Sequence, residues 1–134
     1  MDSFSIKSVR SDCELIFDDY DGDHFTVRLV GSRLSAMLRV WGYTDCKPLV
    51  EMLSYLASLQ SGWSIPAEWA SIESDFALRL RCDSWGHVLV AVHLQRILGR
   101  SEDWELKAEI ETELGQLPRI ASNAARFFNV SIGS

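Results

Sequence analysis

The chain repeats one arrangement twice: strands in which every second residue is apolar, followed by a single amphipathic helix. In the first half, the alternation runs through residues 25–30 and 34–41 and leads to a helix expected near 46–60. In the second half, strands between 76 and 110 lead to a helix expected near 116–128. Alternation indicates half-buried strands, and runs of strands closed by a helix are typical of the α+β class.

We therefore expect one α+β domain spanning residues 1–134. Its predicted architecture is a single antiparallel sheet of about seven to eight strands, in the order ββββ-α-βββ-α, with two helices packed on one face. Residues 63–74 hold two tryptophans and a proline, and we expect them to form a connector. At 134 residues the chain can bury roughly two thirds of the surface of its unfolded form, which favours a single core.

Both predicted helices have a proline in the first turn and one apolar stripe. Thr44 or Asp45 is expected to cap the first helix, and Gly62 is placed to end it. The predicted buried stripe of the second helix is Leu117, Ile120, Ala121, Ala124, Phe127 and Phe128. Stripes of this spacing predict that both helices bury one side against the sheet.

Charge and hydropathy restrict the classes of partner. Nineteen acidic against thirteen basic residues give a formal charge of -6, which opposes unaided binding to nucleic acid and favours a basic protein partner. No apolar run approaches the roughly 20 residues of a membrane helix, so we expect no membrane partner. The first ten residues lack the apolar segment of a signal peptide, which predicts a cytoplasmic location.

The motif content predicts a protein without cofactor or metal. Cys13, Cys46 and Cys82 are scattered and lack a CxxC spacing, which argues against a disulfide framework and a zinc site and favours a reducing compartment. The sequence has no Gly-rich phosphate loop and no GxSxG, HExxH or Ser-Lys motif. The scaffold therefore lacks the usual signatures of catalysis.

The acidic segment DDYDGD, residues 18–23, invites comparison with a calcium loop. If Gly22 held the sixth position of an EF-hand, the first and twelfth positions would be Phe17 and Arg28, which do not coordinate calcium. Asp and Gly are also the residues that tight turns require. The segment is predicted to be a hairpin turn, and weak ion binding by its acids stays an open alternative.

Four residues around the second hairpin resemble parts of a nucleophilic or metal site: Cys82, Asp83, His87 and His93. The two histidines are six strand residues apart, or about 20 Å, which one zinc ion cannot bridge. Cys82 is expected to point into the core and His87 away from it. A hydrolytic enzyme that uses His87 or Asp83 is therefore the least favoured reading of the sequence.

The sheet face opposite the helices is predicted to carry charges of both signs. The expected members are Arg28, Arg39, Arg79 and Arg81 facing Glu105, Glu109 and Glu111. One interpretation is ion pairing on a solvated face, at about 0.2–1 kcal/mol for each pair. The other is a recognition surface, because arginine and aromatic side chains are favoured anchors at interfaces.

The five tryptophans divide between core and surface. Trp63, Trp69 and Trp104 are expected in or at the edge of the core, whereas Trp41 on the open face and Trp85 at a turn are candidate interface residues. The complete set of expected partner-binding residues is Trp41, Arg39, Arg79, Arg81, Trp85, His87, Glu105, Glu109 and Glu111.

Over nearly its whole length, and most specifically from Trp69 onward, the sequence resembles a family of uncharacterised bacterial domains. The resemblance rests on Trp69 to Leu78, on Gly86-His87-Val88, and on the charged strand that leads to Gly115-Gln116-Leu117 and Phe127-Phe128. That family is similar in layout to the WapI-type immunity proteins of contact-dependent toxin systems. The resemblance implies a bacterial, non-enzymatic protein that neutralises a toxin by binding it.

The leading hypothesis is thus a protein-interaction module of the immunity type, whose partner is a basic toxin domain and which is a monomer or a homodimer. A small-ligand-binding domain is the alternative, and it requires a pocket of roughly 300 Å³ or more between sheet and helices. Because edge strands invite pairing, an exposed sheet edge would equally support a homodimer.

Overall fold

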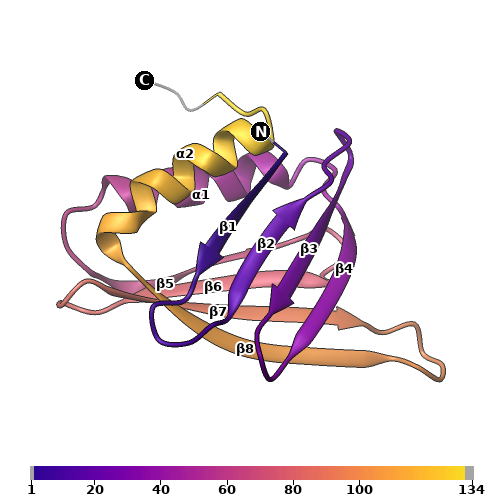
Figure 1. Ribbon diagram of the computed structural model, residues 1–134. Helices are drawn as coiled ribbons and strands as arrows, with labels where there is room; N and C mark the ends of the chain where they lie inside the picture. The colour runs from indigo at the N-terminus through magenta and orange to yellow at the C-terminus, as the bar shows by residue number, and fades with distance from the viewer. Residues whose placement is uncertain (1, 132–134) are drawn as a thin grey trace.

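The computed structural model describes residues 2–131, which form eight strands and two α-helices (Figure 1). The strands are β1 Ser3–Lys7, β2 Glu14–Asp18, β3 His24–Val30, β4 Ser35–Trp41, β5 Trp63–Ala70, β6 Phe76–Cys82, β7 His87–Arg96 and β8 Trp104–Glu113. The helices are α1 Cys46–Ser58 and α2 Leu117–Phe127, and the 3-10 turn Leu114–Gln116 precedes α2. The α+β class predicted from the sequence is confirmed.

The strands form two four-stranded antiparallel sheets, in the orders β1-β2-β3-β4 and β5-β6-β7-β8. The predicted single sheet of seven to eight strands is therefore wrong. Alternation indicates that a strand buries one of its faces, but it does not indicate which strands are the neighbours of that strand in a sheet. Strand β4 is the last strand of the first sheet and β5 is the first strand of the second, and helix α1 lies between them in the chain.

The predicted connector, residues 63–74, contains strand β5. Its residues pair with β6 from Trp63 opposite Cys82 to Ala70 opposite Ala77, and the register shifts between Trp63 and Ala67. Pro66 lies in this irregular part, as prolines in sheets commonly do. The irregularity breaks the alternation, which explains why the sequence pattern predicts a connector here.

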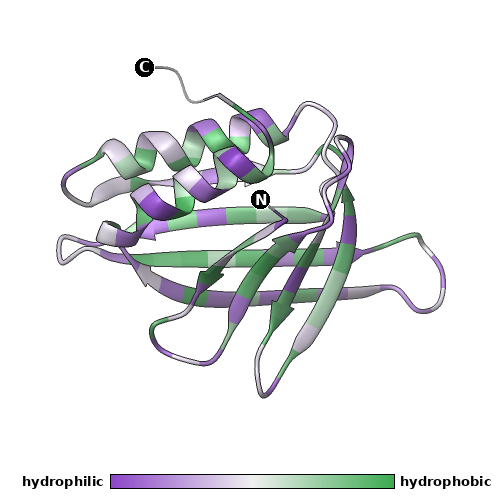
Figure 2. Cartoon of the chain, turned by 45° about the horizontal axis from the view of Figure 1, so that its top comes forward, coloured by the Kyte–Doolittle hydropathy of each residue, from purple (hydrophilic) through white to green (hydrophobic). Residues whose placement is uncertain are grey.

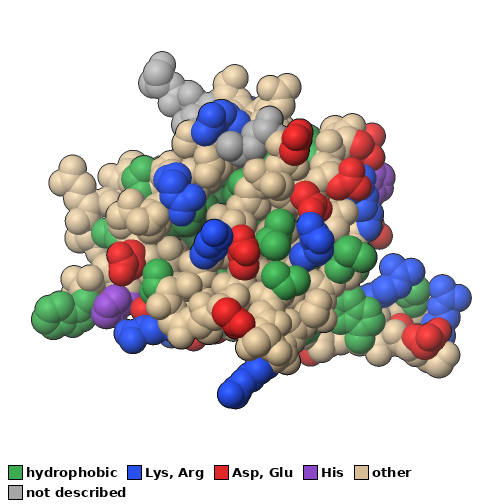
Figure 3. Space-filling view, in the orientation of Figure 1, with side chains coloured by type: hydrophobic (Ala, Val, Ile, Leu, Met, Phe, Trp, Pro, Cys, Tyr) green, Lys and Arg blue, Asp and Glu red, His purple; other side chains and the backbone are tan. Residues whose placement is uncertain are grey.

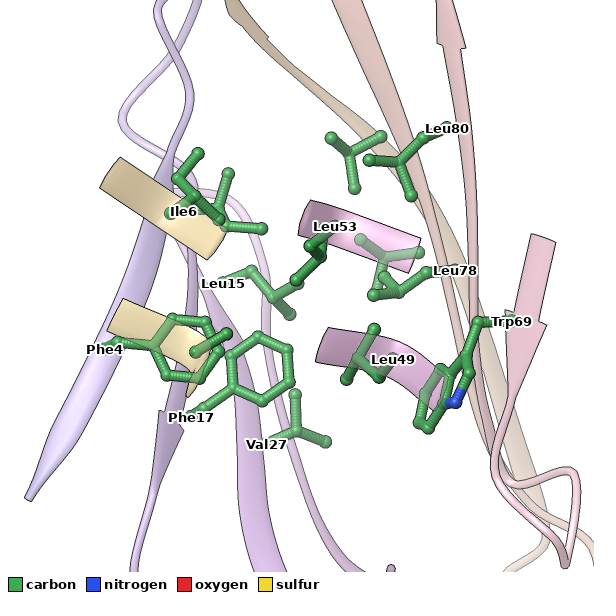
Figure 4. Close-up of a cluster of buried hydrophobic side chains, with 14 of the residues drawn as sticks. Phe4, Ile6, Leu15, Phe17, Val27, Leu49, Leu53, Trp69, Leu78 and Leu80 are labelled. Atoms are coloured by element: carbon green, nitrogen blue, oxygen red, sulfur yellow. The ribbon is translucent and has the colours of Figure 1, made fainter. Parts of the chain in front are cut away.

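The core lies between the two sheets, whose strands cross at a steep angle, and beneath the two helices that pack side by side over the opening between them (Figure 1). The strand side chains that point into the core are almost all apolar. Apolar and hydrophilic residues alternate along strands such as β8 (Figure 2). Figure 4 shows Leu15 and Phe17 from one sheet and Leu78 and Leu80 from the other facing Leu49 and Leu53 of α1. This arrangement leaves each sheet one face toward solvent.

Aromatic rings join the layers. Phe17 is 1% exposed, stacks on Phe4 with ring centres 4.4 Å apart, and lies 5.7 Å from Phe76 of the second sheet. Its ring also meets that of Phe128, just after α2, at 6.3 Å. Because offset and edge-on aromatic pairs add to the gain from burial, Phe17 couples both sheets to the last helix.

The helices begin close to the predicted positions, and every residue of the predicted α2 stripe is buried. The predicted cap of α1 is wrong in detail, since Asp45 occupies the N-cap position without a side-chain hydrogen bond to the helix. Gly62 does not end α1, which stops at Ser58. Instead, Gly62 is required for close packing, because a Cβ atom there would lie 2.2 Å from the carbonyl oxygen of Asp83.

Candidate functional site

The solvent-facing side of the β5–β8 sheet, here called the outer face, gathers most of the predicted site residues. Its side chains alternate with the buried ones, so Arg79 and Arg81 lie between Leu78, Leu80 and Cys82 of β6. Cross-strand pairing then fixes the neighbours: Arg79 is opposite Ala91, and Ala91 is opposite Glu109. The outer face carries Glu68, Ala77, Arg79, Arg81, His87, Leu89, Ala91, His93, Glu105, Lys107, Glu109, Glu111 and Glu113.

A hollow of about 780 Å³ lies on this outer face. Ala77 and Ala91 form part of its lining. Because their side chains are short, the surface of the sheet is depressed here between the longer side chains around them. Charged side chains of both signs surround the alanines, among them Glu68, Arg79 and Lys107. The result is a shallow apolar floor with a charged rim, which is the general layout of a protein-binding patch.

The rim is tied together by ion pairs that run across the strands. Arg79 Nε lies 3.4 Å from a carboxylate oxygen of Glu68, and Arg81 donates to Glu109 at 2.9 Å. His93 Nε2 lies 3.1 Å from Glu105 Oε2 but is not aligned for a hydrogen bond. Exposed pairs of this kind contribute about 0–1 kcal/mol each, so their arrangement matters for recognition more than for stability.

The outer face is acidic in sum. Its glutamates are Glu68, Glu105, Glu109, Glu111 and Glu113, against three bases, Arg79, Arg81 and Lys107. Arg10, in the loop between β1 and β2, pairs with Glu111 at 3.0 Å. A partner surface with an excess of lysine and arginine would therefore complement this face.

The β6–β7 turn, at one end of the outer face, presents the most exposed tryptophan. Asp83 Oδ1 accepts the backbone N–H groups of Trp85 and His87, each at 2.9 Å, and Asp83 Oδ2 lies 2.9 Å from His87 Nδ1. Gly86 completes the turn with a φ of +85°. Trp85 is 84% exposed on this hydrogen-bonded turn, so its indole is displayed from an ordered support.

The hydrogen bonds to Asp83 lower its pKa. The N–H of His87 has the largest effect, and the same effect of backbone donors operates at Asp21 and Asp103, each at its own hairpin turn. Since the folded-state pKa lies below the ordinary value of 3.8, the stabilisation is complete above that value and is lost as the pH falls through the lowered pKa.

We predict that the Asp83→Ala variant loses less stability on acidification than the native chain. The free energy of unfolding, measured with urea from pH 6 to pH 2, should fall less steeply in the variant below about pH 4. Glu51→Ala, on the exposed side of α1, is the matched control and should keep the native slope. Identical slopes for the native chain and the Asp83→Ala variant would contradict the assignment.

Cys82 is not arranged as a nucleophile. Its side chain is buried on the inner face, and burial followed by the nearby charge of Asp83 raises the pKa of the thiol. Its Sγ contacts the carbonyl oxygen of Asp83 at 3.4 Å, whereas His87 faces outward and bonds the Asp83 carboxylate. His93 lies further along β7, opposite Lys107. The structure therefore brings the Asp83 and His87 side chains together, whereas the Cys82 side chain lies on the opposite face of the sheet from His87.

The prediction that all the charged residues share one face is wrong. Arg28, Arg39 and Trp41 lie on the outward side of the β1–β4 sheet, because the strands divide into two sheets. Arg28 pairs with Asp18, and Trp41 lies against Tyr43 with ring centres 4.9 Å apart. These residues thus belong to a second surface.

The acidic segment 18–23 forms the predicted hairpin turn. Asp21 Oδ1 accepts the N–H groups of Asp23 and His24 at 2.9 and 2.7 Å, and Arg39 pairs with both Asp19 and Asp21. Arginine thus occupies carboxylates that an ion would need. Within residues 2–131, no group of three or more His, Cys, Asp or Glu side chains is arranged to hold a metal.

Comparison with family models matches residues 7–131 to a family of unknown function (DUF6228). The chain belongs to this family. Curated proteins give no match to the sequence. Among the described residues of this DUF6228 protein, no helix is long and apolar enough to cross a membrane.

Several residues that line the hollow are absent from the predicted site residues, and Glu68, Ala77 and Ala91 show why. Glu68, the ion-pair partner of Arg79, lies on β5, where the sequence pattern predicts a connector. The alanine floor gives no chemical signal of its own, because Ala77 and Ala91 matter only through the longer side chains around them. Only the cross-strand register brings these residues together.

Proposed function

We propose that this DUF6228 protein is a non-enzymatic protein-interaction module that binds its partner through the outer face of the β5–β8 sheet. The hollow of about 780 Å³, with its alanine lining and charged rim, is the observation that carries the proposal. A central apolar floor gains from being desolvated, and a surrounding rim of charges selects the partner. Figure 3 shows the side of the molecule on which the β1–β4 sheet lies in front, where charged side chains of both signs are distributed among apolar ones.

Trp85 is the proposed anchor of the interface. Tryptophan is among the residues that contribute most to binding, and the Trp85 indole is 84% exposed and so accessible to a partner. The turn around it is braced by Asp83 and therefore requires little ordering when a partner binds. Trp85 would insert into an apolar pocket of the partner, while the adjacent glutamates meet its basic residues.

The partner that we propose is a basic toxin domain, which the module would neutralise as an immunity protein. Support comes from the formal charge of -6 and from the excess of glutamates on the outer face. Complementary charge speeds the encounter of two proteins and excludes partners of like charge. The resemblance to the layout of WapI-type immunity proteins agrees with this proposal.

We predict that Trp85→Ala weakens the complex with the product of the neighbouring gene by about tenfold or more, because truncating an interface tryptophan costs more than 1 kcal/mol. Titration calorimetry with both purified proteins measures the dissociation constant. Tyr55→Ala is the control, because Tyr55 is 64% exposed on α1, on a different surface.

Two results would overturn the proposed function. The first is a neighbouring gene that encodes no toxin, together with the absence of any complex with its product. The second is a complex that Trp85→Ala and the charge reversal Arg81→Glu both leave unchanged, because such a complex would use another surface. Retention of the native fold by each variant is checked by its urea unfolding midpoint.

A further inference from the structure

The four sheet edges of the molecule differ in how they are protected. The β1 and β8 edges meet at one corner, where the N–H of Val9 donates to the carbonyl oxygen of Glu111 at 2.8 Å and Ser8 Oγ accepts the Glu111 N–H. Helix α2 also packs against β1, through Phe127 against Phe4. Strand β5 carries Pro66 and a register break. Each of these features hinders the addition of another strand.

Strand β4 has none of these protections among the described residues. It pairs with β3 without a register break over its seven residues, and it contains no proline. No hydrogen bond from another part of residues 2–131 reaches its backbone along the free edge. A straight, unblocked edge is a template on which a further strand can pair.

The outward-facing backbone groups of β4 can be assigned from the ends of the β3–β4 hairpin. The Gly31 N–H donates to the Leu34 carbonyl oxygen at one end, and the Gly42 N–H donates to the Asp23 carbonyl oxygen at the other. Hydrogen-bonded pairs alternate along an antiparallel ladder, so the even-numbered residues of β4 bond to β3. The N–H and C=O groups that point away from β3 are those of Ser35, Met37, Arg39 and Trp41.

We propose that this edge pairs with β4 of a second copy of the chain, which joins the two β1–β4 sheets into one continuous sheet across a two-fold axis. The register that pairs the strand over its whole length places Leu38 opposite its own symmetry mate. Met37 then stands opposite Arg39 of the second copy, and Ser35 opposite Trp41. Every outward-facing N–H and C=O group of β4 obtains a partner in this register.

The side chains of β4 suit this register. Arg39 is the single charged residue of the strand, and here it opposes a methionine rather than another arginine. Its guanidinium stays paired with Asp19 and Asp21 of its own chain, so its aliphatic part is free to lie along Met37 of the second copy. Shifting the register by two residues in one direction would set Arg39 against Arg39, which like-charge repulsion disfavours.

Exposed apolar side chains border the same edge. Met37 is 63% exposed on one side of β4, while Ile97 and Leu98, 55% and 52% exposed, line a hollow of about 210 Å³ together with Leu38. These two residues lie just beyond β7, where the β7–β8 hairpin projects past the body of the molecule (Figure 1). Pairing along β4 would place the second copy over Met37 and over Ile97 and Leu98, and would remove these side chains from water.

The mass of the chain in solution tests this inference without any other protein. Sedimentation equilibrium at 10–100 μM should give about twice the 15.2 kDa chain mass. Met37→Pro removes an outward N–H that β3 does not use, and Met37→Lys sets a positive charge opposite Arg39; both should shift the dimer dissociation constant upward by about tenfold or more. Ile65→Lys, at an 80% exposed position on β5, is the matched control and should leave the dimer intact.

A cross-linking experiment tests the register itself. In a Cys13→Ser background, Ser35→Cys and Trp41→Cys chains should form a disulfide when mixed, because directly paired residues lie within the range of a disulfide bond. Neither variant should cross-link with itself at a comparable rate. A monomeric native chain at 100 μM, or a dimer that both Met37 variants leave unchanged, would overturn the proposal. Neither result bears on the binding of a toxin by the outer face of β5–β8.

Discussion

Replacing Phe17 with alanine is expected to lower the free energy of unfolding by about 3–5 kcal/mol. Phe17 is 1% exposed and meets rings from both sheets and from the residue that follows α2. Truncation would remove contacts with all these layers and leave a cavity that none of them can fill alone. The loss is a large part of the 5–15 kcal/mol by which domains of this kind are usually stable.

Urea unfolding, followed by tryptophan fluorescence, measures the effect of Phe17→Ala. Tyr55→Ala removes a similar ring from a 64% exposed position and should change the free energy by no more than about 0.5 kcal/mol. If Phe17→Ala cost as little as Tyr55→Ala, the two sheets would not share the aromatic core seen in the structure.

Local structure is well predicted by the sequence where a residue pattern has one physical solution. The α2 stripe that ends in Phe127 has a helical spacing, and its members are buried as predicted. The turn at 18–23 follows from the ability of Asp21 to accept nearby N–H groups. These features depend on residues close together in the chain, so the sequence is sufficient to find them.

The pairing of strands depends on distant residues, and there the sequence is less informative. Alternation assigns Arg39 and Arg81 to the solvent side of their strands, and both lie there. It cannot tell that β4 and β5 belong to different sheets, because an edge and a central strand can show the same pattern. Because of this ambiguity, alternation predicts one surface for Arg28, Arg39, Trp41 and Arg79, whereas the first three lie on the β1–β4 sheet.

In the candidate site, too, features that depend on residues close together in the chain are better predicted than features that depend on distant ones. Alternation places its members on β6, β7 and β8 on one face of the sheet, and the cross-strand register shows that these residues share the outer face. Glu68 was missed because the irregular β5 shows no clear alternation. The bond between Asp83 and His87 was missed because the curvature of a turn, rather than its sequence spacing, brings the two side chains together.

Gly62→Ala is expected to destabilise the fold by about 3 kcal/mol, at the upper end for an overpacked site. The new Cβ would lie 2.2 Å from the carbonyl oxygen of Asp83 and 3.0 Å from that of Cys82. Both obstacles are backbone atoms, so a rotamer change cannot relieve the clash. The β6–β7 turn or the start of β5 must move instead.

Gly115→Ala separates this clash from the general effect of replacing glycine, because a Cβ at Gly115 meets nothing within 4 Å. We expect Gly115→Ala to unfold at nearly the native urea concentration. Because Asp83 also braces Trp85, Gly62→Ala should weaken partner binding under conditions in which the chain is still folded. Loss of stability with unchanged affinity would show that the anchor does not depend on the position of this turn.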